Sequence, residues 1–261
     1  MSAAPATLAE VNAPALLVGA LAAMDANVRG QALGGAPEQA AIWVRAAAAS
    51  GLAEGQVCYG RMLLEGKGVA KDEAVALAWF RRAAEGGDPD ALNMVGRCLE
   101  NGWGAPIDLA EAARCYRRAA QAGHDWAQYN LGHAYLDGRG LPQDPGQALH
   151  WYRQAAGQGH ARAMNLVARC LEQGWGAEAD PAAARDWYRR SAEAGYFRGQ
   201  YNFGLVLADE GRAAEALVWL RDALEAAPSA SRITMIGALK RRPETAIAAL
   251  AAAAEGSAPC C

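Results

Sequence analysis

Apolar residues recur along this chain at the three- and four-residue spacing of amphipathic α-helices. In one clear stretch, Ala91, Val95 and Leu99 fall on a single face. Asp88 and Pro89 precede this run, and both residue types are favoured where a helix begins. The pattern therefore predicts a helix from about Pro89 to Asn101.

The next stretch predicts a second helix that returns along the first. Gly102 and Gly104 end the first helix, and Asp108 is well placed as the N-cap of the second, which Gly123 stops. Its buried stripe consists of Ala112, Tyr116, Ala119 and Ala120. Together the two helices form a hairpin.

The same hairpin pattern recurs at a constant interval of 36 residues. One column of glycines is Gly51, Gly87, Gly123, Gly159 and Gly195, and a column of N-cap candidates is Asp72, Asp108, Asp144 and Asp180. Another column holds Gly60, Gly96, Gly132, Ala168 and Gly204. Lacking a side chain, a residue such as Gly96 lets the two helices of a hairpin approach closely.

A single hairpin cannot cover its own apolar face, so successive hairpins must stack. We therefore predict an all-α fold, a right-handed α-solenoid of stacked antiparallel helix pairs. Its expected divisions are a flexible N-terminus at 1–14, a degenerate hairpin at 15–50, four regular repeats at 51–86, 87–122, 123–158 and 159–194, a fifth, shortened repeat at 195–228, a capping helix pair at 229–255 and a disordered tail at 256–261.

Composition narrows the classes of partner. The chain has 261 residues, is 52% hydrophobic and carries a formal net charge of -3, without the clustered basic surface that nucleic acid requires. Its apolar runs are too short to cross a bilayer, and no signal peptide is evident. We expect a monomeric, cytoplasmic protein that neither binds nucleic acid nor inserts into a membrane, and the abundance of alanine suggests a bacterial one.

The repeats resemble the Sel1-like family, which is related to the tetratricopeptide repeats. The resemblance rests on residues 127–140, AQYNLGHAYLDGRG, on residues 149–159, LHWYRQAAGQG, and on their copies. It implies an adaptor that holds a partner protein in the concave groove of the solenoid. The short loop between Asp209 and Arg212 departs from the pattern and is closer to a plain tetratricopeptide turn.

Three positions on the first helix of each hairpin are expected to face outward into that groove. They lie three residues before, one after and four after the Gly60-type column. Their side chains include amides, arginines and aromatic rings, which suit the recognition of an extended peptide. The predicted floor consists of Asn93, Arg97, Trp126, Tyr129, His133, Asn165, Arg169 and Tyr201. Alternatively, Arg97 with Glu100, and Arg169 with Glu172, are local ion pairs on a solvated face.

Trp103 and Trp175 each sit between two glycines of an interhelical loop. Either ring could be an exposed contact on a second binding surface. The interpretation we favour is that each ring folds back over its own hairpin.

The six cysteines form no C-x-x-C pair or zinc-type spacing. Cys58, Cys98, Cys115 and Cys170 are expected to be buried small residues. Cys260 and Cys261 are weak candidates for metal ligands or a lipidation site, or else part of an inert tail.

No nucleophile with its base, carboxylate pair, metal cluster or phosphate-binding loop emerges from the sequence. We therefore expect no catalysis and no cofactor. The leading interpretation is an interaction scaffold for a partner protein or peptide. The alternative is an accessory factor for a metal- or redox-dependent enzyme, with Cys260 and Cys261 as ligands.

Overall fold

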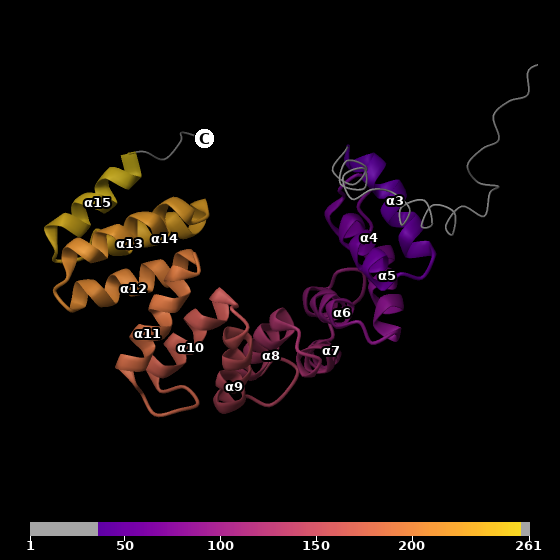
Figure 1. Ribbon diagram of the computed structural model, residues 1–261, viewed down its shortest axis with the longest axis horizontal. Helices are drawn as coiled ribbons and strands as arrows, with labels where there is room; N and C mark the ends of the chain where they lie inside the picture. Colours follow the sequence, from indigo (N-terminus) through magenta and orange to yellow (C-terminus); the bar gives the residue numbers. More distant parts are fainter. Residues whose placement is uncertain (1–35, 257–261) are drawn as a thin grey trace, which may run out of the picture. The chain divides into compact units, whose positions relative to one another are not determined.

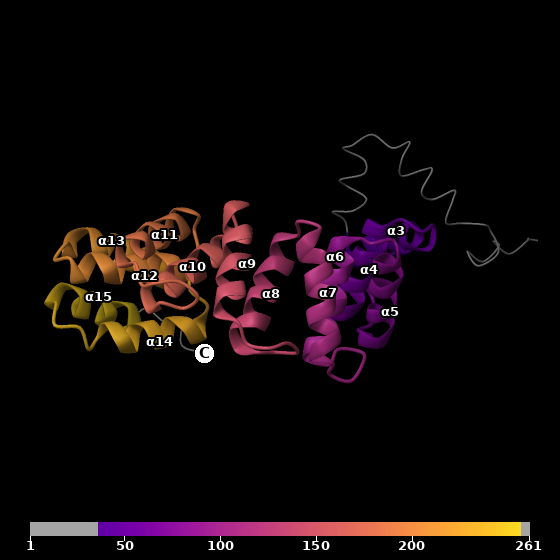
Figure 2. The ribbon, with the colours of Figure 1, turned by 90° about the horizontal axis from the view of Figure 1, so that it is seen from below.

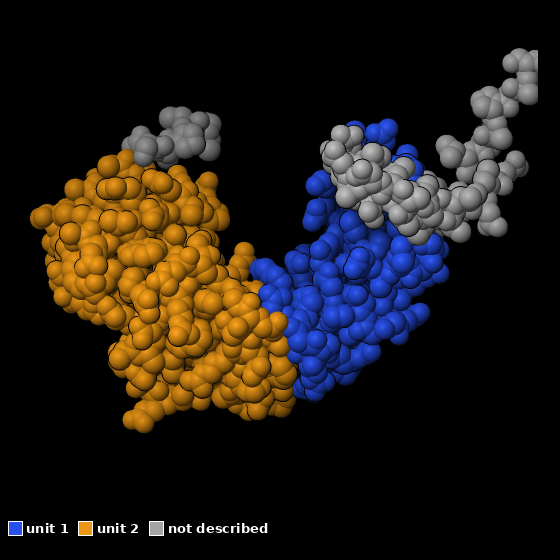
Figure 3. Space-filling model, in the orientation of Figure 1, with its two compact units in different colours: residues 1–127, 139–141 blue, residues 128–138, 142–261 orange. Residues whose placement is uncertain are grey.

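The computed structural model describes residues 36–256, and within that range it contains thirteen α-helices and no β-strand. The helices form two compact units, coloured separately in Figure 3. The first unit comprises the described residues up to 127 with 139–141, and the second comprises 128–138 with the remainder. In each unit, helices that follow one another in the sequence pack as antiparallel neighbours (Figures 1 and 2). Each unit is thus a stack of helical hairpins, and the predicted all-α solenoid is confirmed.

Unit 1 contains five helices, each packed on the next one in the sequence. They are α3 (Pro37–Ala49), α4 (Ala53–Glu65), α5 (Glu73–Glu85), α6 (Pro89–Asn101) and α7 (Leu109–Gln121). The division between the units falls within the next helix, α8 (Asp125–Asp137).

Unit 2 continues the same arrangement from most of α8 onward. Its further helices are α9 (Pro145–Gly157), α10 (Ala161–Gln173), α11 (Pro181–Glu193), α12 (Phe197–Asp209), α13 (Ala213–Ala226), α14 (Ser229–Leu239) and α15 (Thr245–Gly256). The last two pack on each other and on α13.

The hairpin read from the sequence is present as predicted. Helix α6 has the expected bounds, and the carboxylate of Asp108 caps α7 by accepting a hydrogen bond from the backbone N–H of Glu111 at 2.8 Å. The same cap recurs at Asp72, Asp144 and Asp180. These caps satisfy amide groups that a helix start would otherwise leave unpaired.

Gly96 illustrates the close approach expected of its column. A Cβ added there would lie 2.6 Å from Cε1 of Tyr116 on α7. That ring is fully buried, and its hydroxyl donates to the Glu100 carboxylate at 2.8 Å. The missing side chain therefore leaves the space that the tyrosine ring fills.

The second glycine of the interhelical loop, such as Gly104, packs against the backbone of the preceding repeat. Gly104 has φ +76°, and a Cβ on it would lie 2.2 Å from the carbonyl oxygen of Glu73, at the start of the preceding repeat's second helix. Gly176 meets the carbonyl of Pro145 in the same way. Only glycine tolerates both the left-handed backbone and this contact.

The cysteine prediction is correct at three positions and wrong at one. Cys98, Cys115 and Cys170 are buried, and burial raises the pKa of each thiol to about 11. Cys58 is exposed, although Val57 and Tyr59 on either side of it are buried.

Several predicted segments lie outside the described residues. They are the N-terminal segment 1–14, the part of the 15–50 hairpin before residue 36, and residues 257–261 with Cys260 and Cys261. No described helix is both long and apolar enough to cross a membrane.

Candidate functional site

A cleft of about 530 Å³ lies within unit 2 and is lined by residues of α8, α10, α12 and α14 (helices labelled in Figure 1). It brings together five of the eight residues predicted for the groove floor: Tyr129, His133, Asn165, Arg169 and Tyr201. The other three, Asn93, Arg97 and Trp126, belong to unit 1. This cleft is the candidate site.

Aromatic rings form one end of the cleft. Tyr129 stacks on His160 with ring centroids 5.0 Å apart, and His133 meets Tyr129 edge-on at 4.7 Å. His160 is fixed in turn, because its Nδ1 accepts a hydrogen bond from the backbone N–H of Ala163 at 3.1 Å. Rings held in this way provide rigid apolar contact at low entropic cost.

The expectation that Asn93 and Asn165 face outward is wrong, since each is only 4% exposed. Asn165 faces the first helix of the next repeat. The Oδ1 of Asn165 accepts a hydrogen bond from Nδ2 of Asn202 on α12 at 2.8 Å. Asn165 therefore lies at the base of the cleft and links α10 to α12.

Arg169 lies against Trp175, with its guanidinium carbon 5.6 Å from the ring centroid. The alternative pairing of Arg169 with Glu172 is wrong, because these two described residues form no ion pair. The Glu172 carboxylate accepts a hydrogen bond from the Tyr188 hydroxyl at 3.0 Å. Trp175 is half-buried and packs against a hydrophobic cluster of α9, α10 and α11. Its ring also faces the guanidinium of Arg169, a residue of the cleft. A second binding surface at Trp103 and Trp175 stays a prediction.

The equivalent residues of unit 1 have the same arrangement. Arg97 lies over Trp103 at 5.5 Å, and Glu100 accepts from Tyr116 and, at 2.6 Å, from Arg139. Arg97 and Trp103 line a cleft of about 500 Å³ within unit 1, together with Arg61, Lys71, Glu65 and Glu73. Acidic and basic side chains thus occur together there. Trp126, at the start of α8, is 42% exposed.

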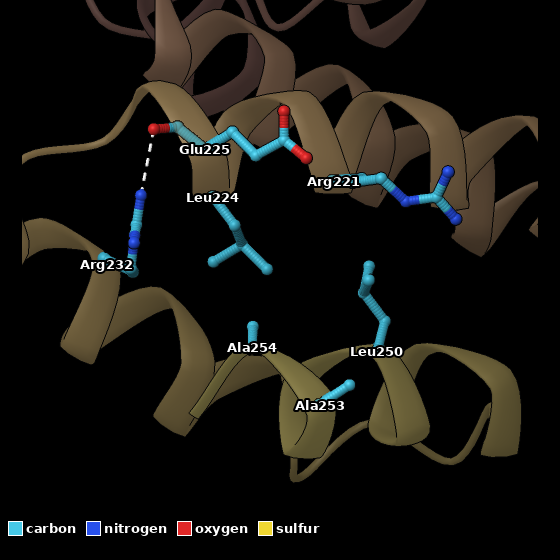
Figure 4. Close-up of a pocket in the computed structure, with 7 residues that line it drawn as sticks. All are labelled: Arg221, Leu224, Glu225, Arg232, Leu250, Ala253 and Ala254. Atoms are coloured by element: carbon cyan, nitrogen blue, oxygen red, sulfur yellow. Dashed lines mark hydrogen bonds between the residues drawn. The ribbon is translucent and has the colours of Figure 1, made fainter. Parts of the chain in front are cut away.

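A smaller cleft of about 220 Å³ lies among α13, α14 and α15 (Figure 4). Leu224, Leu250 and Ala254 point into it, and Arg232 donates to the Glu225 carbonyl oxygen at 2.9 Å along its edge. This cleft contains none of the residues predicted for binding. Within residues 36–256, no group of three or more His, Cys, Asp or Glu side chains could hold a metal ion.

Comparison with known families identifies the repeats. The model of the Sel1 repeat matches residues 53–88, 89–124, 127–160 and 161–196. The chain belongs to the Sel1-repeat family. Its matched repeats begin within two to four residues of those read from the sequence, which start at 51, 87, 123 and 159. A search of curated proteins finds no match.

Solved Sel1-repeat structures are similar to this chain. A Sel1 repeat protein from Oxalobacter formigenes is 31% identical, with a TM-score of 0.72 over 83% of this chain and 89% of its own. The protein c5321, a protective antigen of uropathogenic Escherichia coli, is 28% identical, with a TM-score of 0.67 over 85% of this chain. The chain spans only half the length of c5321. A putative Sel1 repeat protein from Klebsiella pneumoniae, 19% identical with a TM-score of 0.52 over 77% of this chain and 98% of its own, shares the fold.

Sequence reasoning missed four polar residues of the cleft and one of its walls. The residues are Arg162, Tyr196, Arg198 and Asn202, and the wall is α14, which contributes Ser231 and Thr234 among others. A signal for the arginines was available six residues before the Gly60-type column. That position holds Glu54, Asp90, Trp126, Arg162 and Arg198, so it changes from acidic to basic along the Sel1 repeats.

Two arginines of the cleft lie against aromatic rings. Arg162 lies over Tyr196 at 5.8 Å, and Arg198 over Phe197 at 5.7 Å. Three other arginines of the unit pair with carboxylates, namely Arg185 with Glu210, Arg189 with Glu193, and Arg242 with Asp209. A ring face orients a guanidinium without cancelling its charge. The cleft is therefore positively charged, since none of its lining residues is Asp or Glu.

Proposed function

We propose that this Sel1-repeat protein is a non-enzymatic scaffold that binds an extended segment of a partner protein in the cleft of unit 2. Sel1 repeats generally mediate protein–protein interactions. The observation that carries the proposal is the convergence of Tyr129, His133, Arg169 and Tyr201 on one cleft from three successive repeats.

The chemistry of these side chains supports protein binding. Tyrosine and arginine are among the residues that contribute most to binding energy at protein interfaces. Tyr201 is half-buried, and burial raises the pKa of its hydroxyl, so it stays protonated at neutral pH and can donate a hydrogen bond. Amide groups such as that of Asn202 can pair with a peptide backbone.

We also propose that the protein is a monomer in the bacterial cytoplasm. The structural relatives named above come from bacteria, which supports a bacterial origin. The alternative role as a metal- or redox-linked accessory factor depends on Cys260 and Cys261, outside the described residues, and is not proposed.

Affinity capture of the full chain from its native host, followed by binding measurements with the purified partner, tests the proposal. Tyr201→Ala removes a ring from the cleft and is expected to weaken binding about tenfold or more. The control is Val218→Ala, which shortens a side chain that is 54% exposed on α13, outside the cleft.

Two results would overturn the proposal. In the first, no protein is captured in repeated experiments with the folded chain. In the second, the captured partner binds Tyr201→Ala as tightly as it binds the unaltered chain.

A further inference from the structure

In unit 1, an arginine of one Sel1 repeat pairs with an aspartate of the next. Arg61 lies one residue after its glycine column, and Asp90 lies six residues before the next glycine. The Nη2 of Arg61 donates to both carboxylate oxygens of Asp90, at 2.6 and 2.8 Å. The charge of this arginine is therefore neutralised within the protein.

The equivalent positions three repeats further on hold two arginines. Arg169 takes the place of Arg61, and Arg198 takes the place of Asp90. Both line the cleft of unit 2 and are exposed. Among the described residues, neither has a carboxylate within ion-pair distance, and their guanidinium groups lie over the rings of Trp175 and Phe197.

Two guanidinium groups in this register lack the anion that the fold itself supplies in unit 1. Like charges at such positions repel each other, and a carboxylate placed between them relieves that repulsion through charge-assisted hydrogen bonds. Binding an external anion there would not require breaking an internal ion pair. This distinguishes Arg169 and Arg198 from the paired arginines elsewhere in unit 2.

We infer that Arg169 and Arg198 bind an Asp or Glu side chain of the partner, so that the cleft selects an acidic segment. This rests on the proposed function and specifies the chemistry of its partner. The carboxylate would occupy the role that Asp90 has in unit 1, and a third arginine, Arg162, lies in the same cleft. The tyrosine rings and Asn202 would contact the rest of the segment. A protein segment fits better than nucleic acid because the chain as a whole has a net charge of -3.

Fluorescence anisotropy with defined probes tests this inference on the full chain. The probes are a short labelled peptide of alternating glutamate and serine, a matched peptide with glutamine replacing glutamate, and a labelled single-stranded oligonucleotide. The unaltered protein is expected to bind the glutamate peptide about tenfold or more tightly than the glutamine peptide.

Arg198→Asp is the decisive variant, because it recreates in unit 2 the arginine–aspartate pair of unit 1. It should abolish the preference for glutamate while leaving the thermal unfolding temperature unchanged or higher. Arg198→Gln removes the positive charge without adding a negative one, and it should reduce the same preference. It replaces Arg198→Asp in the test if that variant fails to fold. Arg153→Asp is the control, since it makes the same change of charge on an exposed residue of α9 outside the cleft.

The inference is overturned if the unaltered protein binds both peptides equally, if Arg153→Asp loses the preference as fully as Arg198→Asp, or if the oligonucleotide binds more tightly than the peptide. Its failure can be told apart from failure of the proposed function. A captured partner that is sensitive to Tyr201→Ala but not to Arg198→Asp would leave the scaffold role intact and remove the acidic specificity.

Discussion

Asp90 shows how a single carboxylate joins neighbouring repeats. His124, with its Nε2 3.6 Å from the Asp90 carboxylate, and the hydrogen-bonded Arg61 together hold the pKa of Asp90 below its usual range. Folding therefore favours the ionised carboxylate. The resulting stability is present above the unfolded-state pKa of about 4 and is lost as the pH falls through the lower folded-state pKa.

Asp90→Asn should make the protein less stable at neutral pH and have little effect in acid. We expect the free energy of unfolding to fall by about 0.5–1 kcal/mol at pH 7, a modest value because the pair is partly exposed. Urea unfolding at pH 7 and near pH 2.5 measures the difference, with Asp222→Asn on α13 as an exposed control. An equal loss at both pH values would contradict this account of Asp90.

At the scale of the helix, the spacing between the two helices of a hairpin depends on the glycine column. The Tyr116 ring fills the space next to Gly96, and its hydroxyl is held by Glu100. The ring therefore cannot move aside to accept a methyl group without breaking that hydrogen bond.

Gly96→Ala is expected to lower the free energy of unfolding by about 1–3 kcal/mol, because it overpacks this contact. Gly237→Ala on α14 is the matched control. A Cβ there meets no atom within 4 Å, so the same substitution should raise stability by about 0.5–1 kcal/mol. Chemical denaturation of both variants provides the comparison. If Gly96→Ala left the free energy of unfolding unchanged, the two helices would separate easily, contrary to this account.

The helices themselves were predictable because each repeat contains its own apolar periodicity and its own capping residues. The bounds of α6 and the Asp108 cap follow from periodicity and residue type alone. The burial of Asn165 was not predictable in this way. Periodicity identifies the buried face of a single helix, whereas Asn165 is covered by α12, the first helix of the following repeat. For the same reason, the pairing of Glu172 with Tyr188 was missed, as it joins the two helices of a hairpin.

At the scale of the whole chain, the candidate site depends on parts that do not share one repeat pattern. Three of its helices, α8, α10 and α12, carry the 36-residue spacing, whereas α14 belongs to the C-terminal pair and lacks it. The sequence thus predicted five cleft residues but not the wall opposite them. The predicted floor also divides between two units, and only the residues of unit 2 are known to share a cleft.

Site-specific photo-crosslinking in the native host tests the central claim, that this cleft binds a partner protein. A photoreactive amino acid would replace Tyr201 in the cleft or, as a comparison, the exposed Val218 on α13. We predict a covalent adduct with one protein from position 201 and none from position 218. Adducts from position 218 with none from position 201 would show that the protein binds through another face.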